Sequence, residues 1–116
     1  MRTAACIAVL LVAFLHLVFL VLEMFFWTKP FGRRTFGLSK ELADASAPLA
    51  MNQGLYNGLL AAGLLWSLYR ADTATQLFFL GCVIVAGVFG ALTAKRSILF
   101  VQALPAAIAA LLVWKA

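Results

Sequence analysis

Four apolar runs occupy most of this 116-residue chain, at residues 4–27, 48–69, 76–93 and 98–114. An α-helix rises about 1.5 Å per residue, so about 20 apolar residues cross the hydrocarbon core of a bilayer. Each run therefore predicts one membrane-spanning helix. Hydrophobic residues make up 66% of the chain, more than a soluble domain carries. We expect an all-α fold, a four-helix integral membrane bundle forming a single domain over residues 1–116, with no room for a separate soluble catalytic domain.

The charges between these runs predict how the chain lies in the membrane. Lys and Arg are enriched on the cytoplasmic side of membrane proteins. With four crossings, six of these side chains flank the first and third loops and three lie on the other side. Both termini are therefore predicted outside a bacterial plasma (inner) membrane. The net charge of +5 is explained by topology, and no nucleic acid partner is expected.

The first loop, residues 28–47, is the only sizeable polar segment. Its aromatic and aliphatic residues alternate with cations, a pattern typical of a segment lying on an anionic cytoplasmic leaflet. Ser39 is expected to cap a short interfacial helix through about Ser46, and Pro48 to lie in the first turn of the second span. The cations predicted to contact anionic lipid headgroups are Lys29, Arg33, Arg34 and Lys40.

Small residues at helical spacing predict where helices touch. Gly54 and Gly58 form one GxxxG pair, and Gly87 with Ala91 repeats the spacing. Such pairs favour close packing, but they do not distinguish contacts within one chain from contacts in a homo-oligomer.

Two ionisable residues fall inside the first apolar run. His16 and Glu23 lie seven residues apart, which places them on almost the same helical face and about 10 Å apart along the axis. Ionisable groups inside a span are costly and commonly functional. Glu23 is a candidate proton carrier or anchor, and His16 a deeper acid–base candidate. A core histidine with satisfied hydrogen bonds explains His16 equally well.

Further polar residues lie at the start of the second predicted span and just before a proline in the fourth. Amides in hydrocarbon must be paired, so these residues should face other helices or an internal cavity. Pro105 cannot donate to the carbonyl of Val101, which frees an acceptor near Gln102. Interhelical hydrogen bonding without any ligand explains Asn57 and Gln102 equally well. The predicted ligand-binding set is Glu23, Asn52, Gln53, Tyr56, Asn57 and Gln102.

The chain offers too few ligands for a four-coordinate metal site, so no metal is predicted. No phosphate loop, dinucleotide fingerprint or protease motif occurs, and no cofactor is expected. Acid–base chemistry on a buried lipid-like substrate needs only one or two positioned groups. Whether the protein is an enzyme therefore stays open.

The sequence resembles a known family, the small bacterial and fungal membrane proteins catalogued as domain of unknown function 1304. The resemblance runs almost from end to end and implies a four-helix membrane architecture with no established activity. The residues that carry it are His16, the stretch 22–25 with Trp27, the stretch 36–38, the Asn-Gln-Gly-x-Tyr-Asn-Gly motif at 52–58, the run 81–87 and the Phe-Val-Gln-Ala-x-Pro motif at 100–105.

Three functions are compatible with these features. The first is a membrane module, binding or enzymatic, whose polar residues receive the head of a lipid-like or hydrophobic small molecule from the cytoplasmic leaflet. The second is a small proton-coupled exporter working as an oligomer, by analogy with small multidrug-resistance transporters, which share the plan of four helices and one carboxylate in the first. The third is a structural or partner-binding subunit of the membrane.

Overall fold

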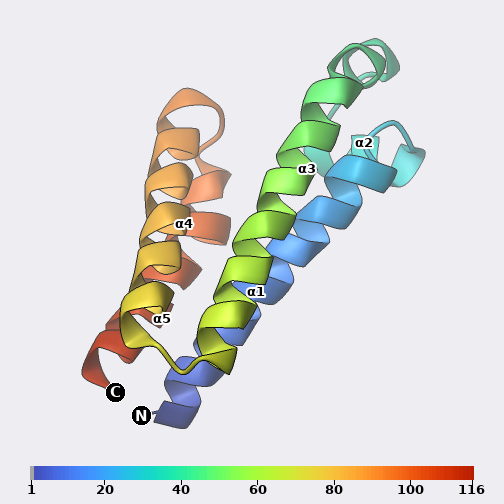
Figure 1. The fold of residues 1–116 in the computed structure, drawn as a ribbon. Helices are drawn as coiled ribbons and strands as arrows, with labels where there is room; N and C mark the ends of the chain where they lie inside the picture. The colour runs from blue at the N-terminus through green and yellow to red at the C-terminus, as the bar shows by residue number, and fades with distance from the viewer. Residues whose placement is uncertain (1) are drawn as a thin grey trace. The chain divides into compact units, whose positions relative to one another are not determined.

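The computed structural model describes residues 2–116 and is all-helical, which confirms the all-α part of the prediction. The elements are α1 (Arg2–Phe25), α2 (Pro30–Phe36), α3 (Lys40–Tyr69), α4 (Thr73–Thr93), the π-helical segment η1 (Leu99–Ala103) and α5 (Leu104–Lys115) (Figure 1).

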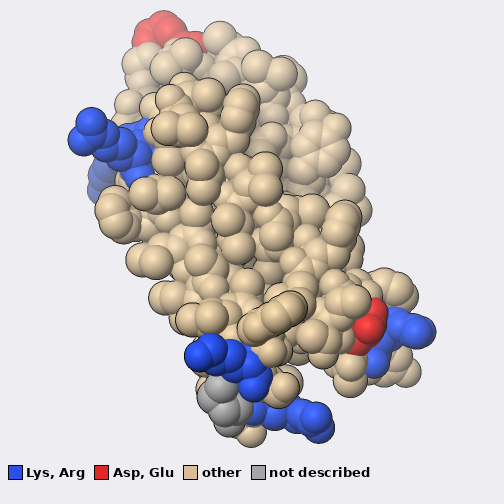
Figure 2. Space-filling model, turned by 90° about the vertical axis from the view of Figure 1, so that its left-hand side faces the viewer, with Lys and Arg blue, Asp and Glu red and all other residues tan. Residues whose placement is uncertain are grey.

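Two of these helices, α1 and α4, are long and apolar enough to cross a membrane by length and composition. The continuous helical stretch Leu99–Lys115 is apolar but shorter. α3 is longer than either at 30 residues, yet it does not meet the same criterion, because polar residues lie at its centre. On the face drawn in Figure 2, Lys and Arg side chains gather in small groups and most of the surface carries no charge. These features suggest association with a membrane.

The described chain divides into two compact units. One contains residues 15–61, which comprise the C-terminal part of α1, the whole of α2 and the N-terminal part of α3. The other contains the chain up to Phe14 together with Ala62–Ala116. Each unit has its own close helix contacts.

In the first of these units, α1 and α3 lie side by side as an antiparallel hairpin (Figure 1). The contact depends on the predicted glycine pair. A Cβ atom on Gly54 would lie 2.6 Å from Cγ of Met24 and 3.3 Å from the carbonyl oxygen of Leu20. A Cβ atom on Gly58 would lie 2.5 Å from Cδ1 of Leu20. The GxxxG pair therefore forms a contact between helices of the same chain.

The loop between α1 and α3 contains a helix that the sequence analysis did not predict. α2 begins at Pro30, whose fixed φ suits a first helical position, and ends at Phe36, before Gly37, which has a left-handed φ of 66°. Gly32 packs on the end of α1 so closely that a Cβ atom there would lie 1.8 Å from the carbonyl oxygen of Phe26. Only glycine permits this approach, so α2 is held against the end of α1.

The prediction of a separate interfacial helix ending near Ser46, with Pro48 in the first turn of the next helix, is wrong. Ser39 does cap a helix, since its Oγ accepts a hydrogen bond from the amide of Leu42 at 3.1 Å. That helix is α3 itself, which continues through Pro48 to Tyr69. Pro48 costs one backbone hydrogen bond inside the helix, and the helix tolerates that loss.

In the other unit, α4 packs against η1 and α5 at an equally close approach (Figure 1). A Cβ atom on Gly87 would lie 2.7 Å from the backbone nitrogen of Ala103. Just beyond, Pro105 cannot donate to Val101, as predicted, and the backbone there widens into the π-helical turn η1. The amide of Leu104 donates to the carbonyl of Leu99, five residues earlier.

Candidate functional site: a carboxylate pocket in the helical hairpin

A hydrogen bond joins the carboxylate of α1 to an amide of α3. Nδ2 of Asn57 donates to Oε1 of Glu23 at 2.5 Å, a short bond. Asn57 is 6% exposed. The bond is possible because Gly54, three residues before Asn57, brings α3 within van der Waals contact of Glu23 and Met24. The predicted glycine pair and the hydrogen bond between Glu23 and Asn57, which was not predicted, thus belong to one contact.

Glu23 also lines a cavity of about 260 Å³ within the same hairpin. The cavity is smaller than the sites that hold whole drug-sized ligands, so it suits the head of a molecule whose tail lies elsewhere. Its wall is apolar apart from Glu23 and Thr28, and no Lys, Arg or His of residues 2–116 lines it. The lining residues are Glu23, Met24, Phe25, Trp27, Thr28, Ala47, Pro48 and Met51.

Trp27 is held in place at the rim of this cavity by contacts on two sides. Its indole Nε1 donates to Oγ of Ser46 at 3.0 Å. Its ring packs against Phe36 of α2, with 4.9 Å between ring centroids. The hydrogen bond fixes the rotation of the indole, and the contact with Phe36 covers one part of it. An aromatic surface that is fixed before a ligand arrives loses little conformational freedom on binding.

The structure brings together only part of the predicted ligand-binding set. Asn52, Gln53 and Tyr56 are exposed on α3, whereas Asn57 is buried beside Glu23. The buried face of α3 runs through Ala50, Gly54, Asn57 and Ala61, and the exposed amides lie off that face. Their role in binding a ligand stays a prediction.

Two further predicted residues lie away from this cavity's lining. His16 is 1% exposed and makes an edge contact with the ring of Phe19 at 5.3 Å. Gln102 lies in η1, in the other unit, and is partly exposed. The catalytic role proposed for His16 and the ligand-binding role proposed for Gln102 stay predictions.

The predicted headgroup cations surround α2. Lys29 precedes the helix, and Arg33 and Arg34 lie in its last turn. Lys40 is the first residue of α3. Its Nζ lies 3.9 Å from Oδ2 of Asp44, and both side chains are exposed. Nε of Arg33 is hidden from solvent and has no hydrogen-bond partner among residues 2–116. Buried donors are nearly always paired, so this nitrogen would gain from an acceptor supplied by another molecule.

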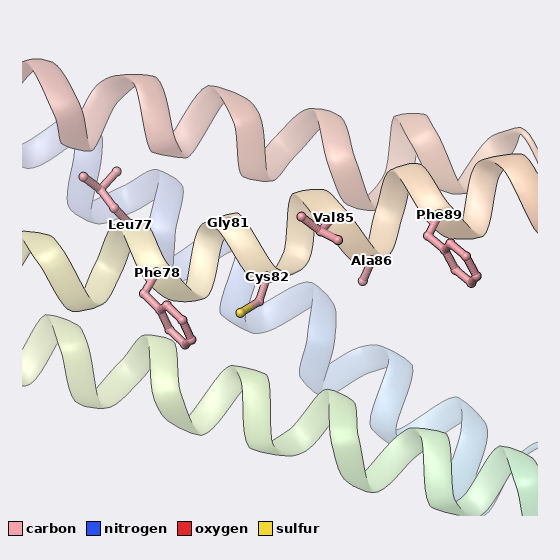
Figure 3. Close-up of a pocket in the computed structure, with 7 residues that line it drawn as sticks. All are labelled: Leu77, Phe78, Gly81, Cys82, Val85, Ala86 and Phe89. Atoms are coloured by element: carbon pink, nitrogen blue, oxygen red, sulfur yellow. The ribbon is translucent and has the colours of Figure 1, made fainter.

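A larger groove of about 680 Å³ runs along α4 in the other unit. Figure 3 shows the rings of Phe78 and Phe89 projecting from the same side of the helix, with Cys82 between them. Every lining side chain is apolar or a thiol, so nothing in the groove can orient a polar group. It suits hydrocarbon and carries no chemistry of its own.

Most of the cavity wall around Glu23 escaped the sequence analysis. In the sequence, Trp27 entered only through the family resemblance, Pro48 only as an expected helix start, and Met51 was not singled out. The sequence feature that could have placed Trp27 near Glu23 is their spacing, since Trp27 lies four residues, about one helical turn, after Glu23. The other wall comes from α3, and its position depends on how α2 turns the chain.

The fold and this cavity define a small all-helical protein with apolar helices and one carboxylate pocket. The chain belongs to the family described as "Protein of unknown function (DUF1304)", whose model matches residues 10–114. It is also similar to the uncharacterized protein YpaA of Lactococcus lactis subsp. lactis (strain IL1403), with 30% identity over 97 residues that cover 80% of this chain and 82% of YpaA. No solved structure matches the chain.

Proposed function

We propose that this protein is a multi-pass protein of the bacterial plasma (inner) membrane that binds the head of a lipid-like or hydrophobic small molecule in the Glu23 pocket. The observation that carries the proposal is the hydrogen bond from Asn57 to Glu23 at the wall of an apolar cavity. A carboxylate placed there is costly unless something compensates for its desolvation. Asn57 supplies one partner, and a ligand would supply another.

The membrane arrangement follows from the apolar helices. Four crossings would be made by α1, α3, α4 and the stretch 99–115, with both termini outside. Gly54 packs against Glu23 and Met24, which places the neighbouring amides of Asn52 and Gln53 level with the C-terminal end of α1. At that level the exposed amides reach headgroups and water, and this accounts for the low hydropathy of α3.

The cations around α2 would hold the same end of the hairpin on anionic lipid. The hidden, unpartnered Nε of Arg33 supports this role, because a lipid phosphate accepts hydrogen bonds from guanidinium groups. The pocket would then open to the cytoplasmic leaflet, from which an amphiphile enters head first. A homo-oligomer is compatible with this arrangement but is not needed to complete the pocket.

Native mass spectrometry of protein extracted with its lipids tests the proposal. The wild type is expected to retain a bound amphiphile, and Glu23→Gln to lose most of it. Glu41→Gln is the matched control, because it removes the same charge from an exposed position in the first turn of α3 outside the pocket. Equal retention by the wild type and both variants would contradict the proposed site.

A further inference from the structure

We infer that the head received by the Glu23 pocket is an organic ammonium group, either the amine head of a lipid or a free amphipathic amine. This inference rests on the proposed function and names its ligand class. It comes from the chemistry of the cavity wall, which combines one carboxylate with aromatic and thioether side chains and contains no cation.

The carboxylate provides the charge complement. Asn57 donates to Oε1 of Glu23, and within residues 2–116 no hydrogen bond is made to Oε2. The salt bridge between Lys40 and Asp44 is the only ion pair in the described chain, so no Lys or Arg of that part neutralises Glu23. Oε2 is thus the atom that a positively charged head would meet. An anionic head would face the same carboxylate with no cation in the wall.

The rest of the wall favours ammonium over a neutral polar head. Trp27 and Phe25 line the cavity, and aromatic faces attract cations, with tryptophan the strongest of them. Trp27 already uses its indole N–H on Ser46, so it presents only its ring to a ligand. Met24 and Met51 add polarisable thioethers that adapt to the shape of an alkylated amine. A sugar or glycerol head would find few hydrogen-bond partners here.

The size of the cavity agrees with this class. About 260 Å³ leaves room for a compact head but not for the attached chain. The exposed Phe25, at 62%, and Leu55, at 48%, flank the hairpin with apolar surface on which a tail can lie. The pocket would thus recognise the head group of the ligand, and the apolar surface of the helices would accept a tail of any length.

Head-group discrimination tests this inference with three probes of equal tail length: hexyltrimethylammonium, hexanoate and hexanol. Trp66→Phe and Trp114→Phe leave Trp27 as the sole tryptophan reporter in full-length protein reconstituted in phosphatidylglycerol nanodiscs. The ammonium probe should change Trp27 fluorescence saturably, and hexanoate and hexanol should bind at least about tenfold more weakly.

Variants of the acidic residues separate the pocket from the membrane surface. In the same background, Glu23→Gln should weaken binding of the ammonium probe about tenfold or more, and Glu23→Asp should retain most of it. Glu41→Gln should leave binding unchanged, although it alters the charge at the membrane surface equally. Circular dichroism identifies any variant that has failed to fold, and Glu23→Asp then provides the comparison.

Competition between phosphatidylethanolamine and the ammonium probe shows whether the natural ammonium group belongs to a lipid or to a free amine. If adding phosphatidylethanolamine to the nanodiscs weakens binding of the probe, the natural head belongs to a lipid; if it does not, the natural ligand is a free amine. Both results support the ammonium class. Tight binding of hexanol or hexanoate that depends on Glu23 would overturn the class and leave the proposed function standing. Saturable binding of none of the probes would overturn both.

Discussion

In both units of this protein, glycine allows two helices to pack closely, but only one of the two contacts includes polar side chains. In the hairpin of residues 15–61, glycines bring α1 and α3 together around a polar pair, Glu23 and Asn57. In the other unit, Gly87 brings α4 against Ala103, and that contact is apolar. Close approach is therefore not itself a mark of function. What distinguishes the hairpin is the polar pair and the cavity beside it, and this difference predicts which substitutions harm the fold and which harm binding.

The largest expected effect on stability is at Gly87. A Cβ atom there would meet the backbone of Ala103 at 2.7 Å, and backbone cannot rotate away. Gly87→Ala should lower the free energy of unfolding by about 2–3 kcal/mol, the cost of an overpacked core. Urea or SDS unfolding in a mild detergent measures it. A change of less than about 0.5 kcal/mol would show that α4 and η1 separate easily.

Gly58 should tolerate the same substitution, because the neighbouring Leu20 side chain can move. A Cβ atom there would meet only Cδ1 and Cγ of Leu20, the far end of a flexible side chain. Gly58→Ala gains about 1 kcal/mol of helix propensity, which offsets the cost of moving Leu20. The same unfolding assay should find a net change within about 1 kcal/mol. A loss as large as that of Gly87→Ala would remove the distinction between the two contacts.

The polar pair should show a measurable coupling that the apolar contact lacks. In a double-mutant cycle with Glu23→Ala and Asn57→Ala, we expect a coupling energy of about 0.6–1.7 kcal/mol, the range for hydrogen bonds between membrane helices. Glu23→Gln should cost less than Glu23→Ala, since its amide oxygen still accepts from Asn57. Strictly additive single substitutions would mean that the hydrogen bond contributes nothing to the hairpin.

The smallest effect concerns the start of α4, outside the apolar part of the helix. A hydrogen bond from the hydroxyl of Thr75 holds the pKa of the Asp72 carboxyl below its ordinary value of 3.8. Because the folded pKa is lowered, this contact stabilises the fold fully above pH 3.8 and the stabilisation is lost as the pH falls through the folded pKa. Thr75→Val should raise the pKa of Asp72, as measured by carboxyl NMR titration. An unchanged pKa would contradict the assignment.

The apolar runs predicted the four long helical regions, and local spacing predicted that Gly54 and Gly58 pack closely against another helix. That the other helix belongs to the same chain did not follow from the spacing. The importance of Glu23 followed from an ionisable group in an apolar run. Its pairing with Asn57 rather than with Asn52 or Gln53 depends on the rotation of α3 about its axis. The sequence of α3 specifies that rotation poorly, since its apolar residues are distributed around the helix and do not form one stripe.

The loop between α1 and α3 was less predictable for a different reason. α2 depends on Gly32 lying against the carbonyl of Phe26, a tertiary contact that no local pattern encodes. Pro48 suggested a helix start, but packing within the hairpin carries α3 through it. Ala47, Pro48 and Met51 of α3 line one side of the cavity, and Ser46 of the same helix accepts the hydrogen bond from Trp27. Because these contacts depend on how the chain turns between α1 and α3, the cavity could not be predicted from the sequence.

A structure of the wild-type protein determined in lipid bilayer nanodiscs would show whether the pocket beside Glu23 and Asn57 holds a ligand. We expect non-protein density in the cavity, in contact with Oε2 of Glu23 and the ring of Trp27, continuing as a tail along the hairpin. The Glu23→Gln protein in the same nanodiscs should lack it. A wild-type cavity closed by Met24 and Met51, with no density against Glu23, would contradict the claim that the polar pair serves a ligand.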